Sequence, residues 1–360
     1  MALGVVNLAQ KYSNKVDERY YAESQALMGT NKDYDWEGVD TVKVYQVDTV
    51  PMNDYTRSGM SRYGTPSELG NTVQTMQLKR DRSFTFTIDK ANRNQTMMVM
   101  EAGKSLSRQE REVIMPEYDR YIFGKQVDAA IANGNFSMAA ISSTNAYASF
   151  LKMDETLGNN LIPLKGRIAY CSYGFCNLLM LDPAFIKYSD KSQEMVIRGE
   201  LGEVDGTKVV KVPASQLPAG VSCLLVHPSA TVAPQQLKEY KTHVDPPGIN
   251  GWLVEGRHMY DAFVLDAKKN GLYVLMGEGT LTTPADAVLE DSTGKLLSVP
   301  NADHFAGGKW QIKTGTTLPS YGDANTGYTD VTFGTTTVSA DSILAYVVDG
   351  KIIAAELLDV

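Results

Sequence analysis

The sequence contains few of the residues that build metal, disulfide or catalytic sites. Its 360 residues include four histidines and three cysteines, Cys171, Cys176 and Cys223. All three cysteines lie in apolar runs, so we expect buried free thiols in a chain made in a reducing cytosol. The spacing of Cys171 and Cys176 is too wide for a zinc knuckle, and no second cysteine pair follows. We therefore expect no metal site, even with His227 as an imagined third ligand.

Long apolar runs and an excess of positive charge are also missing. No run approaches the roughly 20 apolar residues that a membrane span needs, so we expect no membrane partner. The start, MALGVVNLAQKYSNK, has no charged lead-in followed by an apolar block, which argues against a signal peptide. The formal net charge is -8, which argues against a general affinity for nucleic acid.

Catalytic motifs are absent as well. Gly103-Lys104-Ser105 resembles the end of a phosphate-binding loop, but the first glycine of that motif would fall on Met98. The four histidines show no ligand or triad spacing, and no nucleophile elbow occurs. Glu117 and Asp119 are two residues apart and would point to different faces of a helix, so they are poor acid–base partners. We expect neither an enzyme nor a bound cofactor.

The stretch from about Asn71 to Ile131 organises the chain. Before and within it, residues 40–51 and 78–90 alternate as strands, and the roughly 20 polar residues between them form a long loop. In the second strand Phe84, Phe86 and Ile88 share one face. We expect these two strands to pair as a protruding hairpin. Since two strands alone are marginal in water, the hairpin should lie on something else, most simply another subunit, with an ordinary surface hairpin as the alternative.

A long helix is expected to follow this hairpin. Ser107 and Glu110 fit a capping box, Pro116 should kink the helix or divide it, and Asn133-Gly134 should end it. One apolar side is predicted to hold Ile114, Tyr118, Tyr121, Ile122, Ala129 and Ala130. A second helix is expected to begin at a cap on Ser143 or Thr144.

The remaining segments are predicted from shorter patterns. Residues 6–27 show loosely helical spacing that ends near Gly29, and Asp205-Gly206 is a hairpin signal between short strands. Residues 221–227 form a buried strand, and the core closes near Leu275. Residues 276–360 carry eleven Asp and Glu against four Lys and no Arg, in short strand-like runs. The chain is therefore expected to be α+β, with a small acidic β-rich domain or extension at its C-terminal end.

Three of these segments resemble one known family. IMPEYDRYIFGKQVDAA (114–130) looks like the spine helix of tailed-phage major capsid proteins of the Hong Kong 97-like fold. GELGEVDGTKVVKVP (199–213) is similar to the axial-domain hairpin of that family, and residues 237–274 resemble the returning segment of its peripheral domain. The resemblance spans roughly residues 1–275, and the three motifs occur in the family's order.

The resemblance implies a division of the chain. It assigns an N-terminal arm to residues 1–39, an extended β-hairpin loop to 40–90, a peripheral domain with the spine helix to 91–142 and 232–275, and an axial domain to 143–231. Residues 276–360 have no counterpart in the minimal fold, and their assignment as a C-terminal acidic β-rich domain rests on composition alone. We expect their deletion to affect assembly less than deletion of residues 52–75.

The resemblance also implies a function. It implies a structural major capsid protein that assembles as pentamers and hexamers into an icosahedral or prolate shell. The shell would form in the host bacterial cytoplasm and enclose double-stranded DNA in the virion without sequence-specific contact. A scaffolding protein and a portal are implied partners, and a decoration protein is a further candidate. Residues expected to make intersubunit contacts are Tyr55, Arg57, Arg62, Lys79, Arg80 and Arg82, opposite Glu110, Glu112, Glu117 and Asp119.

Two other functions remain open from the sequence. A phage tail or baseplate structural protein would also be β-rich and self-associating, but it has no evident use for a long kinked helix. A carbohydrate-binding surface protein would need aromatic residues clustered at loop tips, and the candidates in the last domain are Trp310, Tyr321 and Tyr328.

Overall fold

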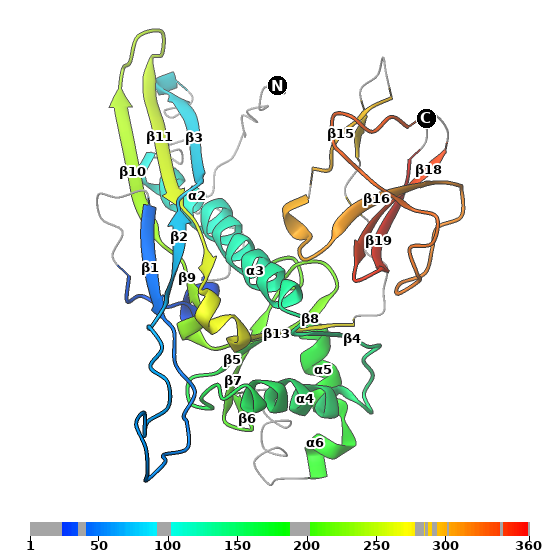
Figure 1. The fold of residues 1–360 in the computed structure, drawn as a ribbon. Helices are drawn as coiled ribbons and strands as arrows, with labels where there is room; N and C mark the ends of the chain where they lie inside the picture. The colour runs from blue at the N-terminus through cyan, green and yellow to red at the C-terminus, as the bar shows by residue number, and fades with distance from the viewer. Residues whose placement is uncertain are drawn as a thin grey trace.

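A long helix runs between two sheets and above a third. The computed structural model describes residues 24–34, 41–91, 102–187, 202–277, 284, 287–289, 294–300, 302–338 and 341–358. Figure 1 shows helix α3 between the sheet that contains β3 on one side and a C-terminal sheet on the other. Of the predicted N-terminal helix only the end lies within the described residues, as the 3-10 turn η1 (Ala26–Gly29). No described helix is both long enough and apolar enough to cross a membrane.

A two-stranded hairpin projects from the body, but its return strand is not the one expected. Strand β1 (Thr41–Val47) pairs antiparallel with β2 (Asn71–Gln77), in a register that sets Val47 opposite Asn71. Strand β3 (Arg80–Asp89) instead joins a three-stranded sheet of order β10-β11-β3, beside β11 (Gly251–Tyr260) and β10 (Gln235–Val244). Burial explains the difference, because the apolar face of β3 finds cover in that sheet and would be bare on a free arm.

The predicted alternation within β3 is confirmed. Ile88 is buried and Phe84 and Phe86 are half-buried, while the threonines between them are exposed. The ring of Phe84 lies over Gly256 of the neighbouring strand, where an added Cβ would come within 2.3 Å of it. The glycine is therefore what lets two strands and an aromatic ring pack this closely.

The long helix begins earlier than the capping box predicts. It comprises α2 (Ala102–Gln109), a π-helical turn η2 (Glu110–Ile114) and α3 (Met115–Ala132), so Ser107 lies inside the helix and does not cap it. The expected irregularity at Pro116 takes the form of the π turn just before it. There the N–H of Met115 donates to the carbonyl of Glu110, five residues back. Asn133 caps the end and Gly134 adopts a φ of +74°, as predicted.

A six-stranded sheet forms the centre of the body and is buried on both faces. Its order is β4-β13-β8-β5-β7-β6, and the strands are β4 (Phe136–Met138), β13 (Leu272–Met276), β8 (Val221–Val226), β5 (Ile168–Ser172), β7 (Thr207–Val212) and β6 (Glu203–Val204). Leu224 and Val226 share a core with α3, while Cys223 and Leu225 face a second core. The buried strand predicted at 221–227 is therefore confirmed over Val221–Val226, while His227 is half-buried and follows the strand.

Three helices supply that second core. They are α4 (Ala146–Asn159), α5 (Tyr173–Leu181) and α6 (Pro183–Lys187). Helix α4 begins after Asn145 rather than at a Ser143 or Thr144 cap, and the Asn145 side chain accepts a hydrogen bond from the Ser142 N–H. All three cysteines are free and buried, as predicted, with the sulfurs of Cys171 and Cys223 3.1 Å apart.

The tight turn predicted at Asp205-Gly206 is confirmed by its backbone, and Asp349-Gly350 forms a second turn of the same kind. Asp205-Gly206, between β6 and β7, has φ of +49° and +76°, and Asp349-Gly350 has +48° and +73°. Both fit two-residue hairpin loops with positive φ at each central position. Short connecting elements complete the body: η3 (Pro228–Ala230), β9 (Thr231–Val232), β12 (Phe263–Val264) and η4 (Asp266–Gly271).

The C-terminal region is β-rich, as predicted, but it shares its core with the body. A four-stranded sheet of order β17-β16-β18-β19 contains β16 (Lys309–Thr314), β17 (Thr329–Asp330), β18 (Ser342–Val348) and β19 (Lys351–Leu358). It is preceded in the chain by β14 (Val288–Leu289), β15 (Leu296–Ser298) and η5 (Ala302–His304). Phe305, Tyr346 and Ile353 belong to the same buried cluster as Val127 of α3 and Val221 of β8. The sheet is thus fastened to the body by apolar packing.

That packing also accounts for the aromatic residues of this region. Trp310 lies in β16, where its ring centroid is 4.9 Å from those of Phe305 and Tyr346. Tyr321 packs against the main core, and Tyr328 packs against a small cluster of the C-terminal sheet. These side chains form no aromatic cluster at loop tips, which removes the sequence argument for a carbohydrate-binding protein.

Candidate functional site

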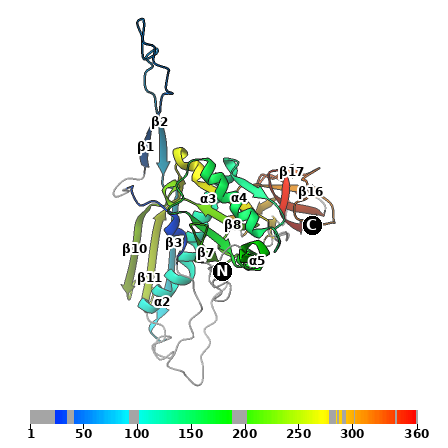
Figure 2. The same ribbon diagram turned by 90° about the horizontal axis from the view of Figure 1, so that it is seen from below.

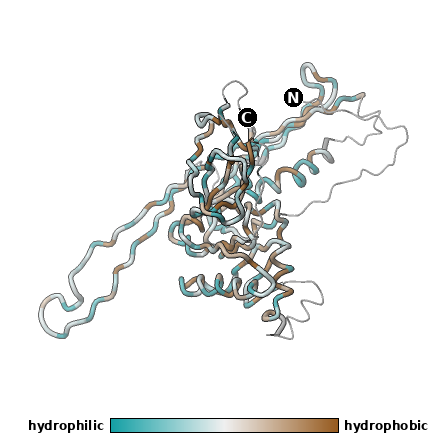
Figure 3. The backbone as a smooth tube through the Cα atoms, turned by 90° about the vertical axis from the view of Figure 1, so that its right-hand side faces the viewer, coloured by the Kyte–Doolittle hydropathy of each residue, from teal (hydrophilic) through white to brown (hydrophobic). Residues whose placement is uncertain are grey.

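The first candidate contact surface is the tip of the β1–β2 hairpin, residues 48–70. Figures 2 and 3 show the hairpin extending well away from the body. The tip is closed by its own turns, since the Thr56 N–H donates to the Arg62 carbonyl at 3.1 Å. Its apolar side chains are bare: Met52 is 99% exposed, Met60 98% and Tyr63 85%. Side chains of this kind, held in place but uncovered, are typical of a surface that another chain buries.

Three of the predicted contact residues lie on this tip. The rings of Tyr55 and Tyr63 meet edge to face at 5.0 Å, and the Arg62 guanidinium donates to the carbonyl of Gly59 at 3.2 Å. Within the described part of the chain, neither Arg57 nor Arg62 has an ion-pair partner. The charges predicted to reach a neighbour are therefore available at the tip, beside the exposed aromatic pair.

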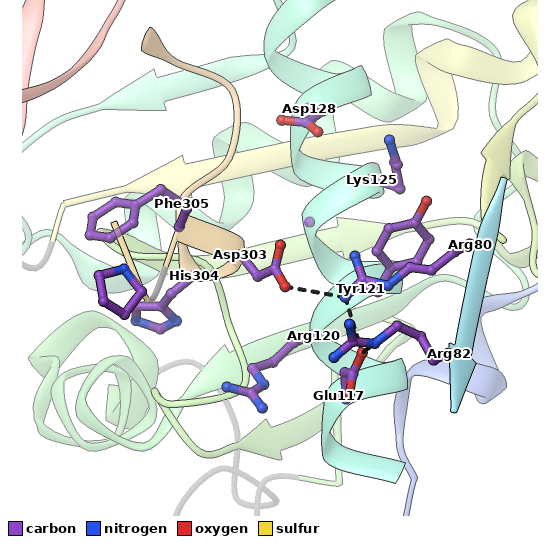
Figure 4. A pocket seen from close by; sticks show the side chains of 13 residues that line it. Arg80, Arg82, Glu117, Arg120, Tyr121, Lys125, Asp128, Asp303, His304 and Phe305 are labelled. Carbon is purple, nitrogen blue, oxygen red and sulfur yellow. Dashed lines mark hydrogen bonds and ion pairs between the residues drawn. The ribbon is translucent and has the colours of Figure 1, made fainter. Parts of the chain in front are cut away.

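A second group of predicted residues meets on α3, but within one chain. Arg80 and Arg82 on β3 approach the same Glu117 oxygen on α3, at 3.0 and 2.8 Å. The Tyr260 hydroxyl donates to that oxygen at 3.2 Å, and Arg80 also reaches Asp303 at 3.1 Å. Figure 4 shows this Arg80–Arg82–Glu117 cluster joining the sheet, the helix and the C-terminal region. Arg80, Arg82 and Glu117 were expected to pair across subunits. In the structure both arginines pair with Glu117 of the same chain.

The arginines set the charge state of Glu117. Burial alone would raise the pKa of its carboxyl, but the hydrogen bonds and charges of Arg80 and Arg82 outweigh burial and hold the pKa below its usual range. Burial raises the pKa of the neighbouring Tyr260 to about 12, helped by the charge of Glu117. Glu117 is therefore ionised, and Tyr260 neutral, at any pH the protein is expected to meet.

This cluster gives a stability prediction with a defined pH dependence. A lowered folded pKa means that Glu117 adds stability above its unfolded value near 4.5, and that this stability is lost as pH falls through the folded pKa. Glu117→Gln should therefore be less stable than the wild type at pH 7, and the difference in unfolding free energy should narrow as the pH falls below about 4.5 and through the folded pKa. Urea unfolding of both proteins at several pH values measures it, and a gap that stays constant with pH would contradict it.

Asp119 faces the other way from Glu117, as the spacing on a helix predicts, and holds the N-terminal segment. The side chain is 1% exposed; it accepts the Ser24 hydroxyl at 2.6 Å and the Gln25 N–H at 3.0 Å. Burial raises its pKa, against the hydrogen bonds from the N-terminal segment. Because η1 has no cap from its own residues, this carboxylate caps it from α3. The hydroxyl of Tyr170 secures the same turn by donating to the Gln25 carbonyl at 2.9 Å.

Removing this cap should loosen the segment it holds. In Asp119→Ala the Ser24 hydroxyl and the Gln25 N–H lose their acceptor, which costs about 1–3 kcal/mol for buried groups. We expect faster amide exchange across residues 24–34, measured by mass spectrometry, with exchange in α4 unchanged. Asp119→Asn keeps one acceptor oxygen, so its amide exchange rate across residues 24–34 should lie between those of the wild type and Asp119→Ala. Unchanged exchange in the Ala variant would show that Tyr170 alone fixes the segment.

The remaining predicted residues are not brought together. The backbone N–H of Lys79 donates to the carboxylate of Asp261, and Glu112 pairs with Arg108 one turn earlier at 3.2 Å. Glu110 lies in the π turn. Asp303 and Asp261 could not be predicted from the sequence, because they lie 223 residues from Arg80 and 182 residues from Lys79, respectively, and neither stands in a recognisable motif.

A cleft of about 410 Å³ opens beside the Arg80–Arg82–Glu117 cluster. It lies between one face of α3 and the loop around η5, and Figure 4 shows the charged side chains that surround it. Four cationic side chains and three carboxylates line it: Arg80, Arg82, Arg120, Lys125, Glu117, Asp128 and Asp303. Burial, aided by the charge of Arg120, lowers the pKa of His304 at its edge. Within the described residues there is no group of His, Cys, Asp and Glu that could hold a metal ion.

Comparison with solved structures finds the same fold in phage proteins. A chain from Mycobacterium phage Che8 is 17% identical with a TM-score of 0.61, covering 74% of this chain and 96% of its own. A chain from the capsid of the cyanophage P-SCSP1u is 11% identical with a TM-score of 0.60, covering 75% of this chain and 92% of its own. A chain from the mature capsid of bacteriophage PhiM1 is 12% identical with a TM-score of 0.57, covering 74% of this chain and 91% of its own. No protein-family model and no curated protein sequence matches the chain. The fold of these phage chains is thus contained almost whole in this one, which carries about a quarter more.

Proposed function

We propose that this chain is the major capsid protein of a tailed double-stranded DNA phage, with the Hong Kong 97-like fold and a C-terminal β-rich addition. The observation that carries the proposal is the fold shared with capsid chains over more than nine-tenths of their length. Its role is structural: copies form pentamers and hexamers of an icosahedral or prolate shell in the virion, assembled in the host cytoplasm. We expect a scaffolding protein and a portal as assembly partners, with a decoration protein as a further candidate.

The domain assignment is part of this proposal. The N-terminal arm, extended loop, peripheral domain and axial domain keep the ranges inferred from the resemblance except at three strands: β3 moves from the loop to the peripheral domain, and β4 and β13 move from the peripheral to the axial domain. The placement of β4 and β13 in the central sheet, beside β8 and β5, supports an axial core built by both halves of the chain. The pairing of β3 with β10 and β11 supports a peripheral domain that includes the end of residues 40–90.

We propose that the hairpin tip is the main intersubunit contact and that its apolar side chains contribute more than its charges. Fully burying a side chain such as Met52 or Met60 contributes about 1.5–3 kcal/mol. An exposed ion pair formed by Arg57 or Arg62 would add about 0–1 kcal/mol. The charges are then better suited to selecting the orientation of a neighbour than to holding it.

Expression of the chain alone, and then with the products of neighbouring genes, tests the proposal directly. We expect closed shells of uniform diameter by electron microscopy and a sedimentation profile dominated by large particles. Tubes or open rings would favour a tail or baseplate protein instead. Material that remained monomeric under every condition would overturn the proposal.

A further inference from the structure

The cleft beside α3 has a surplus of positive charge in an acidic protein. Arg80 and Arg82 are engaged by Glu117, but Arg120 and Lys125 form no ion pair within the described ranges. Arg120 donates only to the Pro116 carbonyl of its own helix, at 3.3 Å, and the Lys125 ammonium lies 5.5 Å from the ring of Tyr121. The two cations lie five residues apart on α3 and form no ion pair within the described ranges, although the charge of Lys125 acts on Asp128. With four cations against three carboxylates, the cleft keeps a net positive charge that suits the binding of further carboxylates.

A bare stretch of helix backbone lies between those cations. Gly124 lines the cleft, and a Cβ added there would meet no heavy atom within 4 Å. A glycine inside a helix is less favourable than alanine, and neither a positive φ nor a close neighbour in this chain requires it. Something outside the chain that approaches the helix backbone closely would account for it.

Acidic turns on the C-terminal sheet are the complementary surface. Asp323 and Asp349 are exposed and have no ion-pair partner among the residues described, and the Asn325 N–H joins their turns by donating to the Gly350 carbonyl at 3.1 Å. The region from 276 to 360 carries a net charge of -7, eleven acids against four lysines, while the whole chain carries -8. The negative charge of the protein is therefore concentrated in the part of the chain that holds these turns.

We propose that the cleft of one copy receives the acidic turns of the C-terminal sheet of a second copy. The inference rests on the proposed shell and names a contact within it. Asp323 and Asp349 of one copy would face Arg120 and Lys125 of the next, with Gly124 leaving room for the turn to reach the helix. Because the two surfaces differ, the contact is head to tail, and repetition about a rotation axis closes it into a ring.

Two kinds of variant of the full chain test the cleft in an expression system where the wild type forms shells. Arg120→Glu/Lys125→Glu should lower the yield of shells about tenfold, as expected for a loss of about 1.4 kcal/mol per contact. Gly124→Leu should lower it similarly by filling the cleft, while Gly124→Ala should raise the midpoint of thermal unfolding and so show that the helix tolerates a side chain. The matched controls on α4 are Lys152→Glu and Gly158→Leu, and both should assemble as the wild type does.

A charge exchange then tests the partner. Asp323→Lys/Asp349→Lys should lower the yield alone, and combining it with the Arg120→Glu/Lys125→Glu change in one chain should restore assembly. Shells at wild-type yield from the Gly124→Leu and Arg120/Lys125 variants would overturn the proposal, and so would loss without restoration by the exchange. A wild-type chain that never forms shells would instead refute the capsid function, so the two failures are distinguishable.

Discussion

Replacing the hairpin tip, residues 48–70, with an Asn-Gly turn is expected to leave the chain folded and to abolish shell formation. Val47 and Asn71 lie opposite each other, so a two-residue turn with positive φ can close the shortened hairpin. No residue from 48 to 70 is buried, and shortening the loop lowers its closure cost by about 2 kcal/mol. Calorimetry should therefore give an unchanged or higher melting temperature, while electron microscopy of the co-expressed material shows no closed particles.

Point variants separate the chemistry of the tip from its length. Met52→Ser/Met60→Ser removes the two most exposed large apolar side chains of the tip and should reduce assembly strongly, whereas Arg57→Ala should reduce it less. Leu161→Ser is the control, because Leu161 is 90% exposed on a loop after α4 and is not expected to meet a neighbour. Intact shells from the shortened hairpin would refute a contact role for the tip.

The sequence predicted local structure well where residues adjacent in the chain determine that structure. The turn at Asp205-Gly206, the helix end at Asn133-Gly134 and the buried strand at 221–227 all follow from residues next to one another. The pairing of β1 was predicted wrongly because β2 carries little apolar signal: Met76 is the one buried residue of its seven. The alternation of apolar residues is stronger in β3, so β1 was predicted to pair with β3. In the structure β3 pairs with β11, which lies about 170 residues further along the chain.

The family resemblance implied that Arg80 and Arg82 of one copy would lie near Glu117 of a neighbouring copy, whereas the structure pairs them within one chain. A single sequence cannot tell a contact within a chain from a contact between copies. The cap that Asp119 provides to η1 was also missed, since nothing in residues 24–29 signals that their donors need an acceptor from another helix. The cleft needs both α3 and the loop around η5, and no local pattern joins them.

In the C-terminal region, too, the sequence predicted the strands but not the distant segments that they contact. The strand pattern of β18 and β19 predicted buried faces but could not say what covers them. Composition suggested a small separate domain or an extension, and the structure shows points of tight contact with α3. The Gly307 N–H donates to Asp128 at 2.5 Å, and a Cβ on Gly307 would come within 2.0 Å of Ile131. A further hydrogen bond, from the Ala219 N–H to the His304 carbonyl at 2.7 Å, holds the loop around η5 to the turn before β8.

A chain ending at Gly277 is therefore expected not to fold. This reverses the expectation from the sequence that deleting residues 276–360 would affect assembly less than deleting residues 52–75. Removing the C-terminal region would uncover the side of the main core that Phe305, Tyr346, Val348 and Ile353 now cover. Burying each such side chain contributes about 1.5–3 kcal/mol. Four of them together, about 6–12 kcal/mol, match the 5–15 kcal/mol that typically holds a whole domain together. We expect insoluble protein, or soluble protein without near-ultraviolet circular dichroism.

Calorimetry of the full chain gives the same test without a truncation. If one core holds both parts, Phe305→Ala at the junction and Leu296→Ala, buried in a separate cluster of the C-terminal region, should each shift a single cooperative transition. The Phe305 change should act more strongly, since Phe→Ala in a core costs about 3–5 kcal/mol against 2–5 for Leu→Ala. If the C-terminal sheet were an independent domain, Leu296→Ala would split off a separate early transition and the 1–277 chain would melt cooperatively by itself. The shared apolar core makes the first result the expected one, because neither part can lose its cover without exposing the other.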